Sequence, residues 1–197
     1  MFYLEKRQYL CYFILATKFQ HKNKRRKLRK YMFRKIEDFQ KDWVYESDAT
    51  LKIIRALTDE SLSRKVSDEG RSLGFLTWHL VTTLSEMFGQ AGLQIDAPAH
   101  DSETPNNAEE IAAAYEKGAK SISEAVAQNW SDEQLEDELP MYGEKWMKGI
   151  ILHALICHQA HHRGQMTVLM RQAGLKVPGV YGPAKEEWQT MGMPAMA

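Results

Sequence analysis

Apolar side chains recur every three or four positions over long stretches of this chain, which is the spacing of amphipathic helices. The stretches predict four helices, over about residues 33–57, 72–89, 108–130 and 144–173. Ser72 is a suitable N-cap for the second helix, and Gly118 on the apolar face of the third would let a neighbour approach closely. No stretch shows sustained β-alternation or a hairpin turn signal, so we expect an all-α protein, an antiparallel four-helix bundle.

The connections between these helices are polar. Residues 60–70 end in glycine, residues 93–107 carry two prolines and two asparagines, and residues 131–143 lead into the last helix. The segment 93–107 is therefore expected to be a long loop.

The fourth predicted helix carries most of the histidines, and its two faces differ in character. One face contains His158 and His162, one turn apart, and is otherwise apolar except for Gln165. The rival face is mixed, but it holds a series of potential metal ligands at intervals of four residues: His153, Cys157 and His161. Because the apolar face should point into the core, we expect His158 and His162 to be the buried pair.

Two imidazoles one turn apart can bind the same metal ion. Burying them among apolar side chains is costly unless their nitrogens find partners, so a bound metal is the more economical account. The alternative is a structural pair that is hydrogen-bonded to carboxylates or to each other. Cys157 is then a small buried or interface residue, and His153 and His161 support the site or pack against a neighbour. His79, on the flank of the second helix, is by itself only a weak candidate for a third ligand.

Composition places the chain among ordinary globular proteins. It has 197 residues, 44% of them hydrophobic and 26% charged, which suits one domain with a sizeable core. Two cysteines are too few for a disulfide framework, so we expect a cytoplasmic protein.

The zero net charge hides a basic leader. Residues 1–31 carry ten Lys/Arg and one acid, whereas the remaining residues carry sixteen Lys/Arg and twenty-five acids. Its apolar run, residues 9–16, is too short to span a membrane, and the main basic cluster follows that run instead of preceding it as in a signal peptide. We interpret residues 1–31 as an extension outside the domain, which then covers residues 32–197. A nucleic-acid or lipid-binding arm and a targeting segment are the alternatives.

Several motifs, taken in order, resemble one protein family. His158-x-x-x-His162-Arg163-Gly164-Gln165 resembles the terminal signature of the DinB/YfiT-like metalloenzymes. The segment 71–80, with Trp78-His79 near its end, and the segment 177–188, with Tyr-Gly-Pro and Trp188, resemble two further segments of that family. The resemblance covers about residues 32–191. Gln159 departs from it, because relatives often carry an acid there, which leaves a role for a carboxylate at that position in doubt.

The resemblance implies a four-helix bundle, often a homodimer, in which three histidines hold a divalent metal. Carried over by position, these ligands are His79, His158 and His162. Relatives include bacillithiol S-transferases and a mycothiol-dependent maleylpyruvate isomerase, so a low-molecular-weight thiol is a candidate cofactor. Zinc is the first choice for neutral nitrogen ligands, although nickel, cobalt, iron or copper also suit such a site.

No catalytic residue is assigned from the sequence, but Arg163 and Gln165 are the candidates. Arg163 is expected either to steady an anionic substrate or to form a surface ion pair, and Gln165 to orient a ligand or water. His161, Tyr181 and Trp188 are candidates for the surroundings of the metal or the pocket, although the two aromatic residues also suit simple packing of the tail.

Three functions follow from an open three-histidine site. The first is a thiol-dependent S-transferase acting on a small molecule, the second is a metal-dependent hydrolase, and the third is a non-catalytic metal-binding or stress-response protein. A basic patch near the site would favour an anionic thiol. A site without a solvent-accessible metal position would favour the third function. We expect neither a membrane span nor nucleic-acid binding by the domain.

Overall fold

The computed structural model describes residues 32–192 and residue 194. By its internal contacts the chain forms two units, Met1–Met32 and Phe33–Ala197, and every helix and strand of the described residues lies in the second. Among these residues no helix is both long and apolar enough to cross a membrane. The predictions made for residues 1–31 lie outside the described residues and remain predictions.

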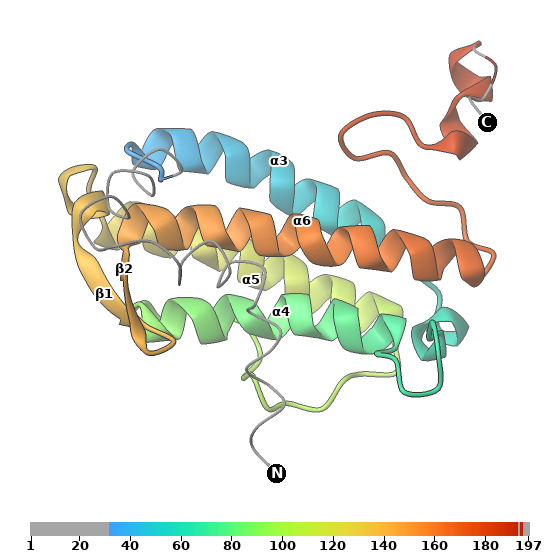
Figure 1. Ribbon diagram of the computed structural model, residues 1–197, viewed down its shortest axis with the longest axis horizontal. Coiled ribbons are helices and arrows are strands. Elements are labelled where there is room, and N and C mark those ends of the chain that lie inside the picture. Colours follow the sequence, from blue (N-terminus) through green and yellow to red (C-terminus); the bar gives the residue numbers. More distant parts are fainter. Residues whose placement is uncertain (1–31, 193, 195–197) are drawn as a thin grey trace, which may run out of the picture. The chain divides into compact units, whose positions relative to one another are not determined.

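Four long helices form a bundle, which confirms the predicted fold class (Figure 1). They are α3 (Ile36–Ile54), α4 (Leu73–Gln90), α5 (Ala108–Asn129) and α6 (Lys148–Gln172). Short 3-10 turns are η2 (Asp59–Ser63), η3 (Glu133–Glu136), η4 (Lys185–Glu187) and η5 (Gln189–Met191). The side chain of Ser72 caps α4, as predicted, by accepting a hydrogen bond from the backbone N–H of Phe75 at 3.1 Å.

The bundle differs from a simple antiparallel one in the direction of its neighbouring helices. Helix α4 is antiparallel to α6, and α3 is antiparallel to α5, whereas α4 and α5 are parallel to each other (Figure 1). The long loop of residues 91–107 makes this possible, because it returns the chain along the bundle before α5 begins. In the parallel pair, a Cβ atom at Gly118 of α5 would lie 2.9 Å from Leu84 of α4, so this glycine permits the close approach that we expected.

A short β-hairpin between α5 and α6 was not predicted. Strand β1 (Glu138–Met141) pairs antiparallel with β2 (Glu144–Met147), and α6 begins only at Lys148 instead of about residue 144. The two turn residues have positive φ, 50° at Tyr142 and 82° at Gly143, as a two-residue hairpin of type I′ requires. Tyr142 is an unusual residue for such a turn. The Tyr-Gly pair was therefore not recognised as a hairpin signal.

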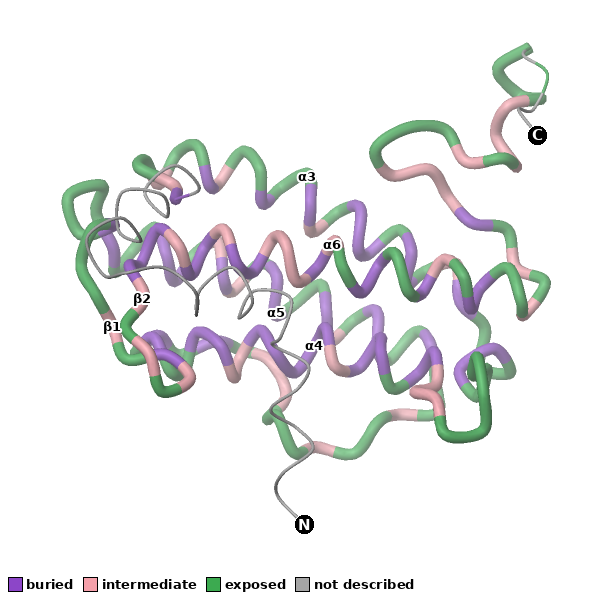
Figure 2. The backbone as a smooth tube through the Cα atoms, viewed as in Figure 1, coloured by how far each residue is buried: buried purple, intermediate pink, exposed green. Residues whose placement is uncertain are grey.

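One apolar core joins all four helices, and their inward faces are buried along most of their length (Figure 2). The fully buried side chains include Phe39, Trp43, Leu80, Leu84, Ile111, Tyr115, Ile151 and Leu155. Helices α4 and α6 pack directly against each other, and the three histidines lie between them.

Candidate metal centre

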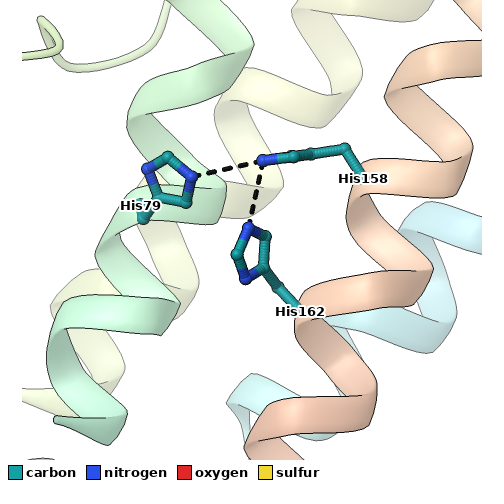
Figure 3. Close-up of side chains that lie close together, drawn as sticks. All are labelled: His79, His158 and His162. Atoms are coloured by element: carbon teal, nitrogen blue, oxygen red, sulfur yellow. Dashed lines mark hydrogen bonds between the residues drawn. The ribbon is translucent and has the colours of Figure 1, made fainter. Parts of the chain in front are cut away.

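Three histidines from two helices converge on one point (Figure 3). His79 lies on α4, and His158 and His162 lie one turn apart on α6. The Nε2 atom of His158 is 3.2 Å from that of His79 and 3.1 Å from that of His162. The imidazole planes are inclined to one another by 69° to 86°. The antiparallel packing of α4 against α6 thus brings His79 to the pair predicted from the periodicity of the last helix.

These distances fit a shared metal ion better than hydrogen bonds between the rings. A ring nitrogen carries either one hydrogen or one lone pair, so His158 Nε2 cannot form proper hydrogen bonds to both neighbours at once. Two nitrogens that each lie ~2.1 Å from one tetrahedral metal ion are separated by about 3.4 Å. The two separations that involve His158 are close to this value, and all three ligand atoms lie within 4.8 Å of one another. The residues present therefore fit a divalent metal held by three imidazoles.

The protonation state of the three histidines also suits metal binding. Burial is the main cause that lowers the pKa of His79 to about 3, and the nearby His162 ring and then Arg71 contribute to the same shift. Burial likewise lowers the pKa of His162 to about 4 and holds the pKa of His158 well below its usual range. All three rings are therefore neutral near pH 7, which is the form that donates to a metal.

Gln165 fixes the orientation of one ligand. Its Oε1 atom lies 2.7 Å from His162 Nδ1. Because an amide oxygen only accepts, Nδ1 carries the hydrogen and Nε2 keeps its lone pair toward the cluster. The ring of His161, an exposed residue, lies 4.8 Å from that of His162 at an interplanar angle of 72°. Both residues thus lie beside His162, and their predicted roles remain predictions.

Arg163 makes its polar contacts with residues outside the histidine cluster. It is only 2% exposed, so the expected surface ion pair is wrong. Its guanidinium donates to the backbone carbonyl of Glu46 at 2.9 Å and to Thr50 Oγ1 at 2.8 Å, and it pairs with the Glu46 carboxylate. The hydroxyl of Tyr181 accepts from the same guanidinium and donates to Glu46. Arg163 and Tyr181 therefore join α6, α3 and the C-terminal segment. A role for Arg163 in holding a substrate and a place for Tyr181 at the pocket remain predictions.

The rival face of α6 does not assemble a second cluster. His153 Nε2 lies 3.5 Å from Cys157 Sγ, and both residues are half-buried, but His161 is exposed and packs against His162 instead. Among the described residues, His79, His158 and His162 are the one group of histidine, cysteine and acidic side chains placed to share an ion.

Two further residues of the sequence motifs have defined places. Gln159 is fully buried, and its Oε1 atom accepts a hydrogen bond from the hydroxyl of Tyr115 on α5 at 3.0 Å. A neutral amide suits this site, because an ionised carboxylate would be costly to bury there. Trp188 is half-buried and lies between the turns η4 and η5 of the C-terminal segment. Its predicted role at the pocket is not tested by these contacts.

Sequence reasoning missed two groups of residues around the site. Glu46 and Thr50 were not singled out, although they share the apolar face of α3 with Phe39 and Trp43, and a carboxylate on such a face needs a buried partner. Arg71 and Phe75 lie within a quoted motif, but only the structure shows that they stack beside His79. A buried charge on an apolar helix face is the signal that could have found the first group.

The fold and the site together indicate a class of protein. It is a helical bundle with a candidate metal site, formed by three neutral histidines from two adjacent helices. Residues 32–195 match the sequence profile of the DinB family, and the chain belongs to that family.

Relatives share most of the length of this chain. It is 43% identical over 164 residues to the Bacillus subtilis protein named "Uncharacterized protein YrdA", which covers 83% of this chain and 98% of the relative. A DinB-like protein from Bacillus cereus, solved by crystallography, is 42% identical and superposes with a TM-score of 0.73 over 76% of this chain and 100% of its own. The DinB-like protein YjoA from Bacillus subtilis, 18% identical with a TM-score of 0.57 over 73% of this chain and 96% of its own, shares the fold.

Proposed function

We propose that this protein is a metal-dependent enzyme that transfers a small thiol to an electrophilic substrate. His79, His158 and His162 hold a divalent ion, with zinc as the first choice for neutral nitrogen ligands. The observation that carries the proposal is the convergence of three neutral imidazoles from only two helices. Three protein ligands leave a metal with positions for a reactant, which is the pattern of catalytic sites.

The chemistry of such a site depends on the metal-bound reactant. When bound, the metal lowers the pKa of a thiol or a water and so supplies a nucleophile near pH 7. The histidines themselves cannot act as general acids there, because their pKa values lie far below 7. Their task is to hold the ion. Gln165 keeps the ring of His162 oriented for that task.

One observation favours a reactive site over a structural one, and a second favours an anionic thiol. His79 and His158 retain partial exposure, which suits a reactive site better than a closed structural one. A positive group lies beside the cluster, since the guanidinium of Arg71 stacks on the Phe75 ring, which in turn stacks on His79. A positive surrounding favours an anionic reactant such as a thiolate.

The first experiment measures metal content after loading with zinc and dialysis. We expect one ion per chain in the wild type and in His153→Ala, a matched control from the same helix. His79→Ala and His158→Ala should each lose stoichiometric binding. Metal retained by both of these variants would contradict the three-histidine site.

The second experiment measures activity of the metal-loaded protein. Chlorodinitrobenzene serves as the electrophile, with and without bacillithiol or another small thiol, and a nitrophenyl ester tests for hydrolysis. Thiol-dependent conjugation that is lost in His158→Ala supports the transferase. Ester hydrolysis without a thiol supports the metal-dependent hydrolase instead, and metal binding with neither activity supports a non-catalytic protein.

A further inference from the structure

A three-layer stack flanks the histidine cluster at the start of α4. The guanidinium carbon of Arg71 lies 4.8 Å from the centre of the Phe75 ring. The Phe75 ring in turn stacks on His79, with 6.2 Å between ring centres and an interplanar angle of 10°. Phe75 and His79 are four positions apart on one face of α4, and Arg71 lies just before its N-cap Ser72. The stack therefore holds a guanidinium beside the cluster and within about 11 Å of the His79 ring, because the two contacts follow in series.

The guanidinium of Arg71 places a fixed positive charge beside the cluster, because an arginine side chain stays protonated in proteins. A divalent ion bound by neutral ligands would add further positive charge, so this region suits a negatively charged molecule.

The Phe75 ring adds an apolar surface between the two charges. Its side chain is 43% exposed although it is a large aromatic group. The ring contacts both the guanidinium of Arg71 and the imidazole of His79. A molecule that extends from the cluster to Arg71 would pass along this ring, which offers apolar contact to a short carbon chain.

We propose that Arg71 is a specificity-determining residue of the histidine site, and that the substrate thiol carries a carboxylate several bonds away from its sulfur. This rests on the proposed function. The sulfur lies at the metal, the carbon chain follows Phe75, and the carboxylate pairs with the guanidinium of Arg71. An arginine suits this role because its planar fork matches a carboxylate with two hydrogen bonds.

The test compares two thiols that differ at their far end, mercaptohexanoate and mercaptohexanol. The full-length protein is loaded with cobalt, and the thiolate-to-cobalt absorption band reports binding of each thiol. The wild type should bind mercaptohexanoate about tenfold to a hundredfold more tightly, the worth of a charge-assisted hydrogen bond. Arg71→Gln should remove this preference and leave the affinity for mercaptohexanol unchanged.

A matched control and a second variant keep the test decisive. Arg55→Gln removes an exposed arginine that pairs with Glu116 across α3 and α5, and it should keep the full preference. Arg71→Lys retains the charge but not the planar fork, so its preference for mercaptohexanoate should fall below that of the wild type. This variant replaces Arg71→Gln in the test if Arg71→Gln does not fold. Equal affinities for both thiols in the wild type, or a preference unchanged in the Arg71 variants, would overturn the proposal. Failure of the wild type to bind cobalt or either thiol would instead overturn the proposed function on which it rests.

Discussion

Gln165 Oε1 accepts a hydrogen bond from His162 Nδ1 at 2.7 Å, three residues further along the same helix. This contact assigns the hydrogen of the ring to Nδ1 and directs the lone pair of Nε2 toward His79 and His158. Gln165 is an exposed residue, so its side chain adds little to the core. Its contribution lies in the orientation of one ligand.

We predict that Gln165→Ala lowers the affinity for zinc by about tenfold to a hundredfold, as loss of a group that orients a ligand does in other metal sites. Stability without metal should change little. Competition with a chromophoric chelator measures the affinity, and Gln172→Ala, another exposed glutamine of α6, is the control. An affinity equal to that of the wild type would show that Gln165 does not position His162.

Arg163 should matter for stability instead of for metal binding. Arg163→Ala leaves the Glu46 carboxylate buried without its partner, and such a loss costs about 3–5 kcal/mol. Chemical denaturation measures the free energy of unfolding. Arg171→Ala removes an exposed partner of Glu186 on the same helix and should cost less than about 1 kcal/mol.

Metal content separates this structural role from a catalytic one. Folded Arg163→Ala protein should still bind one ion, and the double variant Arg163→Met with Glu46→Leu should recover much of the lost stability because no charge remains buried. Full stability of Arg163→Ala together with a loss of activity would contradict the structural role and favour the substrate-binding role.

Periodicity predicted the parts of this protein that depend on local sequence. The apolar line of α6 identified His158 and His162 as the inward pair, and His162 is 5% exposed whereas His161 on the other face is exposed. His79 could not be assigned in this way. Its ring reaches the pair only because α4 packs against α6, and a contact over 79 residues leaves no local signal.

The features that were missed depend on unusual local chemistry or on long-range packing. Tyr142 adopts a positive φ, which is rare for a residue with a bulky side chain, so the hairpin had no ordinary turn signal. The partner of Arg163 lies 117 residues away on α3. A long loop is compatible with either direction of the next helix, and packing of the apolar faces decided that α5 runs parallel to α4.

The basic leader should be dispensable for the bundle. We predict that a chain starting at Met32 folds, with a free energy of unfolding within about 0.5 kcal/mol of the full chain, because the helices from Ile36 onward build their own core. It should also bind one zinc ion. Denaturation and metal analysis of both chains provide the comparison. An insoluble or metal-free shortened protein would show that residues 1–31 belong to the domain.

The metal-free protein should lose stability in mild acid. The pKa of an ordinary histidine is 6.5, whereas that of His79 in the fold is about 3 and that of His162 about 4, mainly because burial disfavours the charged ring. Above pH 6.5 both the folded and the unfolded chain hold these rings neutral, and their contribution to stability is complete. As the pH falls below 6.5 the unfolded chain takes up protons that the folded chain refuses. The free energy of unfolding should therefore decrease by up to about 1.4 kcal/mol per pH unit for each such histidine.

Denaturation of the metal-free protein at intervals between pH 7.5 and pH 4.5 measures this slope. The steep decrease should begin near pH 6.5 and continue toward pH 4, because the folded-state pKa values lie at or below that point. His79→Leu removes one of the responsible rings. Its free energy of unfolding should therefore change less steeply with pH, by the contribution of about one bound proton. Carboxylates contribute at the acidic end of the range in both proteins and cancel in the difference between them. An equal slope in the wild type and in His79→Leu would mean that His79 is protonated as easily in the folded chain as in the unfolded chain, which would contradict the lowering of its pKa by burial.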